Sequence, residues 1–420
     1  MELDDAVLHF PFASGPGGTQ PEEFRELRAG CPVVPVILPS GDRAWLASRY
    51  EDILTVLDDP RFSRDLSRAG APRLAEGFDA SLVKDMIVGM DPPEHTRIRR
   101  IVQGAFTPRR IRTWEPRVRA VAERLLDDFA AGPGRTGDLY EGFALPLPIR
   151  IISELLGIPD DDAADFRRWT ETGLSLTRWT REEMLAAHRE YVDYVGALIA
   201  ARRTAGVADG TGNGTGNGAG DDERQGDLLD ALVGARDQDD RLSEHELVQL
   251  VRALISAGHE TTATVFTRGL YTLLTHPEQF ALLRAEPERL DAAVEEILRY
   301  VPPGSGGTPR IATTEIEIGG VRVKPHEGVI APFGAANHDP ARFADPDTFD
   351  IARVDPPSHI AFGHGPHHCL GVHLARLELR VAFETVLRRL PGLELAVPAE
   401  ELAWSEGLRV LKLQALPVRW

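Results

Sequence analysis

The pattern of apolar and polar positions predicts helices over most of the chain between Glu94 and about Tyr300. Within this region, the stretch "IISELLGIPD" is expected to end a helix. Gly157 readily takes the left-handed conformation that closes many helices, and Pro159 cannot continue one. The chain is therefore expected to be mainly α-helical.

A longer helix is predicted between Ser243 and Pro277. Ser243 is a suitable N-cap, Glu246 three residues later completes a capping box, and Pro277 ends the helix. About 33 residues at ~1.5 Å each span about 50 Å, so this helix is long enough to cross a whole domain.

Strand patterns lie near the two ends of the chain. "VVPVILPSGDRAWLAS" predicts a hairpin with its turn at residues 40–42, and "EIEIGGVRVKPHEGVIAPF" predicts another around residues 319–320. "LRVLKLQALPVRW" is expected to close the chain in a similar way. Small sheets beside a large helical body predict an α+β fold rather than a doubly wound sheet.

Residues 206–227, "GVADGTGNGTGNGAGDDERQGD", have no hydrophobic period. Their glycine and polar residues predict a flexible surface loop, and a domain linker is the alternative. Because the helices predicted on both sides look like parts of one body, we expect a single domain over residues 1–420.

Composition narrows the possible functions. The chain has 420 residues and a formal net charge of −18, which argues against general nucleic-acid binding because phosphate backbones attract basic surfaces. The N-terminus lacks the basic residues of a signal peptide and an apolar run long enough to cross a bilayer. The two cysteines, Cys31 and Cys369, lie far apart, which favours a reducing compartment. A cytoplasmic protein that binds neither nucleic acid nor membrane is expected.

The stretch "FGHGPHHCLG", residues 362–371, gathers potential metal ligands. The candidate ligands are His364, His367, His368 and Cys369, together with His373 just after the stretch. Zinc binds nitrogen and sulfur, but structural zinc sites usually draw ligands from two spaced pairs, and no second pair lies nearby. Gly363, Gly365 and Pro366 also prevent the first histidines from lining one helical face. Zinc stays one interpretation of this stretch.

Cys369 precedes a helix predicted from Gly371 to Leu390. Free N–H groups and the helix dipole favour a thiolate at such a position. Lowering a thiol pKa from about 8.5 to below about 7 needs about 2 kcal/mol, whereas a helix dipole supplies about 0.3–1 kcal/mol. A metal cation deprotonates a coordinating thiol outright. The turn therefore suits one thiolate on one metal better than a free nucleophile.

The same stretch resembles the haem-binding loop of the cytochrome P450 superfamily, whose pattern F-G-x-G-x-H-x-C-x-G it matches at every fixed position. The resemblance implies haem b, iron protoporphyrin IX, ligated through Cys369. It places Phe362, Gly363, His367 and Gly371 around the cofactor. It covers nearly the whole chain and implies the family's fold, with the long central helix across the haem.

A second match is "AGHETT", in the middle of the long helix. Gly258 and the two adjacent threonines are weak helix formers, and threonines that bond back to carbonyls a turn earlier would merely bend the helix. By resemblance, Ala257 and Gly258 border the haem at a local opening that accepts dioxygen. Glu260 and Thr261 would then pass protons to the dioxygen. This acid–alcohol pair favours a monooxygenase that uses dioxygen over a peroxide-driven relative.

Two further matches concern the framework and the haem propionates. "EEILR" provides Glu296 and Arg299, an ion pair at helical spacing, and the resemblance adds Arg353 as the third member of a structural brace. "MDPPEHTRIRR" provides two residues on one helical face, which alone would be a solvated surface. By resemblance, four residues bind the propionates through charge-assisted hydrogen bonds: His95, Arg99, Arg310 and His367.

A basic stretch runs from Glu94 to Arg119, with eight arginines against two acids. The arginines are Arg97, Arg99, Arg100, Arg109, Arg110, Arg112, Arg117 and Arg119. A charged helix surface is usually just solvated. In the family, this region borders the cysteine side of the haem, where an electron donor docks. The resemblance therefore implies an acidic partner such as a ferredoxin, with its ferredoxin reductase, steered by opposite charge.

The resemblance implies a haem-thiolate monooxygenase that hydroxylates or epoxidises a small organic substrate. By family position, the pocket draws on residues 71–88, 174–179, 254, 257, 301–308 and 407–410. These segments are mostly apolar and small, so a largely apolar natural product of bacterial secondary metabolism is expected. The same haem chemistry used for oxidative coupling or desaturation is an alternative. A zinc-binding structural protein and a haem sensor without turnover are the two other classes considered.

Overall fold

The computed structural model of the chain describes residues 8–77, 79–159, 162–208, 227–237, 241–304, 307–354 and 358–420. The α-helices are α1 (Glu23–Ala29), α2 (Tyr50–Asp58), α3 (Glu94–Val102), α4 (Pro108–Thr113), α5 (Glu115–Ala130), α6 (Pro146–Leu156), α7 (Ala163–Gly173), α8 (Arg181–Ala208), α9 (Leu228–Asp237), α10 (Glu244–Thr275), α11 (Pro277–Ala285), α12 (Leu290–Tyr300), α13 (Phe333–Asn337) and α14 (Val372–Arg389). Short helices of other types are η1 (Pro16–Gly18), η2 (Ala80–Leu82), η3 (Ile87–Gly89), η4 (Gln103–Phe106), η5 (Pro133–Arg135), η6 (Tyr140–Ala144), η7 (Pro287–Arg289), η8 (Gly365–His367) and η9 (Ala399–Glu401). None of the described helices combines the length and apolar character that a membrane span needs.

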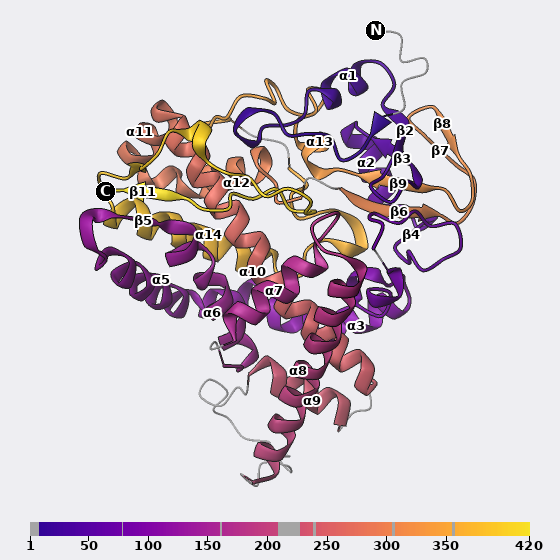
Figure 1. Cartoon of the computed structure of the whole chain (residues 1–420), viewed down its shortest axis with the longest axis horizontal. Coiled ribbons are helices and arrows are strands. Elements are labelled where there is room, and N and C mark those ends of the chain that lie inside the picture. The colour runs from indigo at the N-terminus through magenta and orange to yellow at the C-terminus, as the bar shows by residue number, and fades with distance from the viewer. Residues whose placement is uncertain are drawn as a thin grey trace.

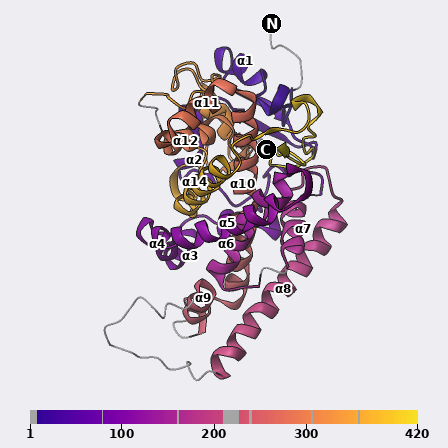
Figure 2. The same ribbon diagram turned by 90° about the vertical axis from the view of Figure 1, so that its left-hand side faces the viewer.

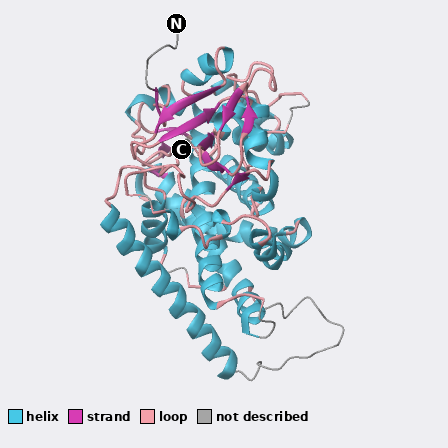
Figure 3. Cartoon of the chain, turned by 90° about the vertical axis from the view of Figure 1, so that its right-hand side faces the viewer, coloured by secondary structure: helices cyan, strands magenta, loops and turns pink. Residues whose placement is uncertain are grey.

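The strands form a larger group on one side of the molecule (Figures 1 and 3) and a smaller group on the opposite side (Figure 1). They are β1 (Leu8–His9), β2 (Val33–Ile37), β3 (Arg43–Ala47), β4 (Phe62–Ser63), β5 (Thr136–Asp138), β6 (Thr308–Ala312), β7 (Ile316–Ile318), β8 (Val321–Val323), β9 (Gly328–Ala331), β10 (Glu394–Leu395) and β11 (Pro417–Arg419). One sheet has the order β1-β2-β3-β9-β6-β4, a second has the order β10-β11-β5, and β7 pairs with β8. The expected mainly helical fold with small sheets is confirmed.

Two of the predicted hairpins are present and the third is not regular. β2 pairs antiparallel with β3, and β7 with β8, around the expected turns. At the C-terminus, β11 pairs with β10 and β5 instead of with the preceding residues. Leu408 and Val410 form isolated bridges with Ser175 and Gly304. The segment is therefore not a simple closing hairpin, because its residues bond to separate parts of the chain.

The long helix α10 forms the axis of the helical body. Ser243 and Glu246 make the predicted capping box, and the helix ends at Thr275, before Pro277 begins α11. Most of its residues are buried, and it contacts α6, α8 and α14. One apolar core surrounds it, and a second lies between the six-stranded sheet and α2.

The glycine-rich segment follows α8, which extends with α9 away from the rest of the body (Figure 2). Residues 209–226 lie outside the described residues, so the loop predicted over 206–227 is not tested there. Its first three residues belong to α8, which ends at Ala208. That boundary was placed too early, because one glycine in a helix costs only about 1 kcal/mol and need not end it.

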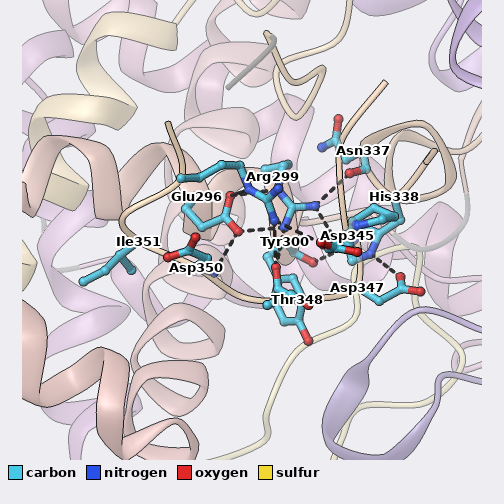
Figure 4. A network of polar contacts seen from close by, with 12 residues as sticks. Glu296, Arg299, Tyr300, Asn337, His338, Asp345, Asp347, Thr348, Asp350 and Ile351 are labelled. Atoms are coloured by element: carbon cyan, nitrogen blue, oxygen red, sulfur yellow. Dashed lines mark hydrogen bonds and ion pairs between the residues drawn. The ribbon is translucent and has the colours of Figure 1, made fainter. Parts of the chain in front are cut away.

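Glu296 and Arg299 are almost fully buried and form the expected ion pair (Figure 4). Arg299 donates from two nitrogens to the Glu296 carboxylate, each at 2.7 Å. It also donates to three main-chain carbonyls between Asn337 and Thr348. The Arg353 Nε lies 3.4 Å from the same carboxylate. This network fixes α12 to the segment that leads into the cysteine loop.

We expect Glu296→Ala to destabilise the fold by about 3–5 kcal/mol, because it leaves Arg299 buried without a carboxylate. Urea unfolding followed by far-ultraviolet circular dichroism measures this loss. Glu286→Ala is the matched control, since Glu286 and Arg289 form the same i,i+3 pair with side chains 40% and 37% exposed. The control is expected to lose less than about 1 kcal/mol. Equal losses in the two variants would contradict a bracing role for Glu296.

Candidate functional site

The cysteine loop depends on its glycines. Gly363 and Gly365 have φ angles of 74° and 67°, in the left-handed region that favours glycine. A Cβ at Gly365 would lie 2.7 Å from a carboxylate oxygen of Asp58, so the residue allows the loop to approach α2. The Cys369 N–H donates to the carbonyl of Phe362 at 2.8 Å and closes the loop. These backbone features hold the cysteine just before α14.

Cys369 is half-buried, with protein around most of its side chain. Burial raises its pKa above the usual value, although the N–H of Gly371 donates to the sulfur and the charges of Arg99 and Arg376 lower the pKa. The helix N-terminus and the arginines therefore do not suffice to ionise the thiol. A coordinated cation does so, which agrees with the sequence argument for one thiolate on one metal.

Cys369 lines a cavity of about 420 Å³ between α10 and the cysteine loop. Ala257 is exposed although it lies in the middle of a buried helix, because its side chain faces this cavity. Of the twelve residues expected at the site, eleven line the cavity: His95, Arg99, Ala257, Gly258, Thr261, Arg310, Phe362, Gly363, His367, Cys369 and Gly371. The remaining one, Glu260, does not.

The cluster of possible zinc ligands does not converge. All five candidates lie in the described part of the chain. Over that part, no group of three or more His, Cys, Asp or Glu side chains is arranged to hold a metal ion. The zinc interpretation has no structural support.

One end of the cavity collects nitrogen donors that lack acidic partners. The rings of His95 and His367 lie 4.2 Å apart, and the His95 Nδ1 is buried without a hydrogen-bond partner. Burial lowers the pKa of His95 and, with the charge of Arg310, that of His367 to about 2, so both rings are neutral. Arg310 is 2% exposed and donates to the Pro309 carbonyl. Such a set fits the anionic propionates of a haem.

The α10 wall of the cavity is a continuous helix across residues 257–262. The Thr261 Oγ1 donates to the carbonyl of Ala257 at 3.1 Å, which is the back-bonding that the sequence left as an alternative. The expected local opening of the helix is therefore absent. A Cβ at Gly258 would lie 2.8 Å from the Ile152 side chain, so this glycine also allows α6 to approach α10.

Glu260 points away from the cavity into a buried ionic cluster. Its carboxylate accepts from the Lys412 Nζ at 2.7 Å, and the same ammonium donates to Glu171 at 2.6 Å and to the Tyr140 hydroxyl at 3.1 Å. Burial lowers the pKa of Lys412, but Glu260, Tyr140 and Glu171 together raise it above its usual value, so the ammonium stays protonated. Arg167 in turn pairs with Glu171.

Sequence reasoning missed two residues of this region, Lys412 and Glu378. Lys412 is 2% exposed, and its signal is a single lysine between two leucines in the mostly apolar stretch "LRVLKLQAL". Glu378 lines the cavity from α14 without a partner for its Oε2, and burial raises its pKa well above the usual value. The signal is a carboxylate between two core leucines, and the side chain is neutral.

The arginines between Glu94 and Arg119 divide into two groups. Three form ion pairs, namely Arg97 with Glu246, Arg117 with Glu154, and Arg119 with Glu384 and Glu115. Arg99 donates to the carbonyl of His368 at 2.7 Å. Among the described residues, the other four pair with no acid: Arg100, Arg109, Arg110 and Arg112. Arg112 borders a hollow of about 270 Å³ with His373, four residues after Cys369, so this surface lies on the cysteine side.

Comparisons with known proteins agree along the whole chain. The cytochrome P450 family model matches residues 19–391. Nocardicin C N-oxygenase of Nocardia uniformis subsp. tsuyamanensis is 44% identical over 400 residues, 94% of each chain. Mycinamicin IV hydroxylase/epoxidase of Micromonospora griseorubida is 43% identical over 413 residues, 98% of each chain. The crystal structure of LnmA, a cytochrome P450 hydroxylase of the leinamycin biosynthetic pathway of Streptomyces atroolivaceus, is 41% identical with a TM-score of 0.84 and covers 99% of this chain and 100% of its own.

Members of this family bind haem through a cysteine thiolate, and the residues around the cavity fit that cofactor. The buried thiol needs a cation on its sulfur, and the donors at His95 and Arg310 need anionic acceptors. Fold, site and extended sequence identity agree, and the chain belongs to the cytochrome P450 family of haem-thiolate monooxygenases.

Proposed function

We propose that Cys369 is the thiolate ligand of the haem iron in this enzyme. The observation that carries the proposal is the single cavity on which eleven expected site residues converge from four separate parts of the sequence. Phe362, Gly363 and Gly371 shape the loop around the sulfur. When bound, haem supplies the reductive activation of dioxygen.

The propionates of that haem are assigned to His95, Arg99, Arg310 and His367. Each charge-assisted hydrogen bond is worth about 1.5–3 kcal/mol, so four of them hold a dianionic cofactor strongly. The neutral state of the two histidines suits this role, because each keeps one N–H to donate without adding a buried charge. Ala257 and Gly258 border the haem from α10.

Proton delivery is assigned to Thr261 and Glu260. The Thr261 hydroxyl borders the cavity, and the buried Glu260 carboxylate on the preceding residue would take up a proton and pass it to that hydroxyl. Lys412 donates to Glu260 and links it to Glu171, whose side chain is 11% exposed. Protons from solvent would therefore enter at Glu171 and reach Glu260 through Lys412.

The substrate is proposed to be a largely apolar natural product of bacterial secondary metabolism, hydroxylated or epoxidised by the enzyme. Apolar side chains of Ile87, Val88, Leu254 and Val265 line the cavity, and two relatives are named for nocardicin C and mycinamicin IV. Oxidative coupling or desaturation by the same haem is the second candidate reaction.

Electrons are proposed to come from an acidic ferredoxin and its ferredoxin reductase. The unpaired Arg109, Arg110 and Arg112 beside the cysteine side of the cavity support this partner. The two unpaired cysteines support a cytoplasmic enzyme. We propose that residues 1–420 act as one cytochrome P450 domain, which agrees with the 99% coverage of this chain by LnmA.

We expect Cys369→Ser to abolish the far-red-shifted Soret band of the reduced, carbon-monoxide-bound protein, because a hydroxyl does not supply a thiolate. Difference spectroscopy measures this band. Cys31→Ser is the matched control, since Cys31 is the other free cysteine and is exposed, and it is expected to keep the band. A band retained by Cys369→Ser would contradict the proposal that Cys369 ligates the haem iron.

We expect Thr261→Ala to keep haem but to divert electrons from product to hydrogen peroxide by about 10-fold or more, because a general acid is lost. Lys412→Met should act in the same direction, since Glu260 then loses its counter-charge. Tyr140→Phe is the control, because it removes one acceptor of Lys412 and leaves both ion pairs.

Peroxide formed per NADPH and the solvent isotope effect are measured with a substrate identified by its spin-state shift. A relay predicts that both quantities change in Thr261→Ala and Lys412→Met and stay near the wild-type values in Tyr140→Phe. Unaltered product per NADPH in Thr261→Ala would refute the relay.

We expect the double reversal Arg109→Glu and Arg110→Glu to slow reduction by ferredoxin and to weaken its dependence on salt, because steering by opposite charge is lost. Stopped-flow reduction at several ionic strengths measures both effects. Reversal of Arg43 and Arg322, on β3 and β8, changes the net charge equally and is expected to leave the rate within about 2-fold. Equal reduction rates and equal salt dependence in the two double variants would contradict the proposed docking surface.

A further inference from the structure

The C-terminal loop around Arg409 lies beside the cavity. The Leu176 N–H donates to the Gly407 carbonyl at 2.7 Å, and the Arg409 N–H donates to the Leu174 carbonyl at 2.9 Å. Val410 bridges to Gly304, next to Pro303 in the cavity wall. The loop therefore joins the segment after α7 to the segment before β6.

The Arg409 side chain is a partly buried cation with no partner among the described residues. Its Nε is fully enclosed and makes no hydrogen bond, and no described residue forms an ion pair with it. Burial lowers its pKa, and no acidic side chain acts against that effect. Leu408 and Val410 on either side are buried, while Arg409 keeps some accessible surface. An uncompensated buried charge is costly, so this arrangement points to an absent anion.

Arg64 connects Arg409 with the cavity. Arg64 lines the cavity and donates to the carbonyls of Val88 at 2.7 Å and Pro309 at 2.9 Å. Its guanidinium is close enough to those of Arg310 and Arg409 for their charges to lower its pKa, after the larger effect of burial. Positive charge therefore accumulates on the side of the cavity nearest Arg409.

A comparison of charges leaves cations in excess. Four arginines, Arg64, Arg99, Arg310 and Arg409, act on this region. Two haem propionates supply two negative charges, and Asp91, which accepts from the Arg64 N–H at 2.7 Å, also lies 3.8 Å from Arg68. Glu378 is neutral, and the carboxylates of Glu171 and Glu260 are taken by Arg167 and Lys412.

We propose that Arg409 recognises a carboxylate of the substrate, so that the enzyme acts on an organic acid with an otherwise apolar body. Of these four arginines, Arg409 alone has a guanidinium that donates to no oxygen of the described residues, and a planar guanidinium matches a carboxylate with two parallel hydrogen bonds. The inference deepens the proposed function and rests on its haem cavity.

The test uses the haem-loaded enzyme and two probes that differ in one group, 12-(imidazol-1-yl)dodecanoic acid and 12-(imidazol-1-yl)dodecan-1-ol. The imidazole binds ferric iron and shifts the Soret band, and the flexible chain lets the far end reach Arg409. We expect the wild-type enzyme to bind the acid at least about 10-fold more tightly than the alcohol. In Arg409→Gln that ratio should fall to about 1-fold, with the affinity for the alcohol changed by less than about 3-fold.

Two further variants distinguish charge recognition from a general disturbance. Arg409→Lys keeps the charge and should keep most of the preference for the acid. Arg252→Gln removes another buried arginine, one that contacts Gln249 and His188, and should leave the ratio unaltered. Equal binding of the two probes by the wild-type enzyme, or an unaltered ratio in Arg409→Gln, overturns the proposal.

An unaltered ratio together with a lower haem content in Arg409→Gln would show that Arg409 binds a propionate instead. Imidazole ligation needs ferric haem but not the Cys369 thiolate, so the ratio reports on Arg409 even if the carbon-monoxide band contradicts the ligand assignment. Failure of the two proposals is thus distinguishable.

Discussion

The structure depends on a thiol that the fold buries before it can ionise. Burial raises the pKa of Cys369 more than the Gly371 N–H and the two nearby arginines lower it. The site is therefore incomplete without a cation on the sulfur, and a haem iron meets that need. The glycines at 363 and 365, the approach of α2 and the brace around Glu296 all serve to hold this one side chain at the cavity wall.

At the other walls of the cavity, the charged groups are cations, and they need anionic partners. Histidines that would add buried charge are neutral, whereas arginines stay charged and need anions. On the far side of α10, Lys412 lies between the carboxylates of Glu171 and Glu260 and donates to both. Each ionised group of the interior thus implies its partner, and where the partner is missing a ligand is expected.

Sequence alone predicted the features that depend on short spacing. The capping box of α10, the hairpins around residues 40–42 and 319–320, and the cysteine loop are local patterns with direct physical causes. It did not predict Lys412, because a lysine 152 residues after Glu260 in the chain gives no local sign of an ion pair with it. The local opening of α10 was expected by resemblance, but Thr261 bonds back to Ala257 and the helix stays continuous.

The C-terminal segment shows why contacts between residues far apart in the chain could not be predicted from local sequence patterns. In an extended chain, successive side chains point to opposite faces. Leu408, Val410 and Lys412 are all buried on one face, where Lys412 meets α10, while Arg409 lies on the other face toward Arg64. A segment whose alternation predicts only a strand therefore brings one cation to the proton-delivery residue and another close to Arg64 in the cavity wall. Leu413 bridges to the nearby Trp404, but Leu408 and Val410 bridge to the remote Ser175 and Gly304, so the position of Arg409 depends on tertiary contacts that no sequence period encodes.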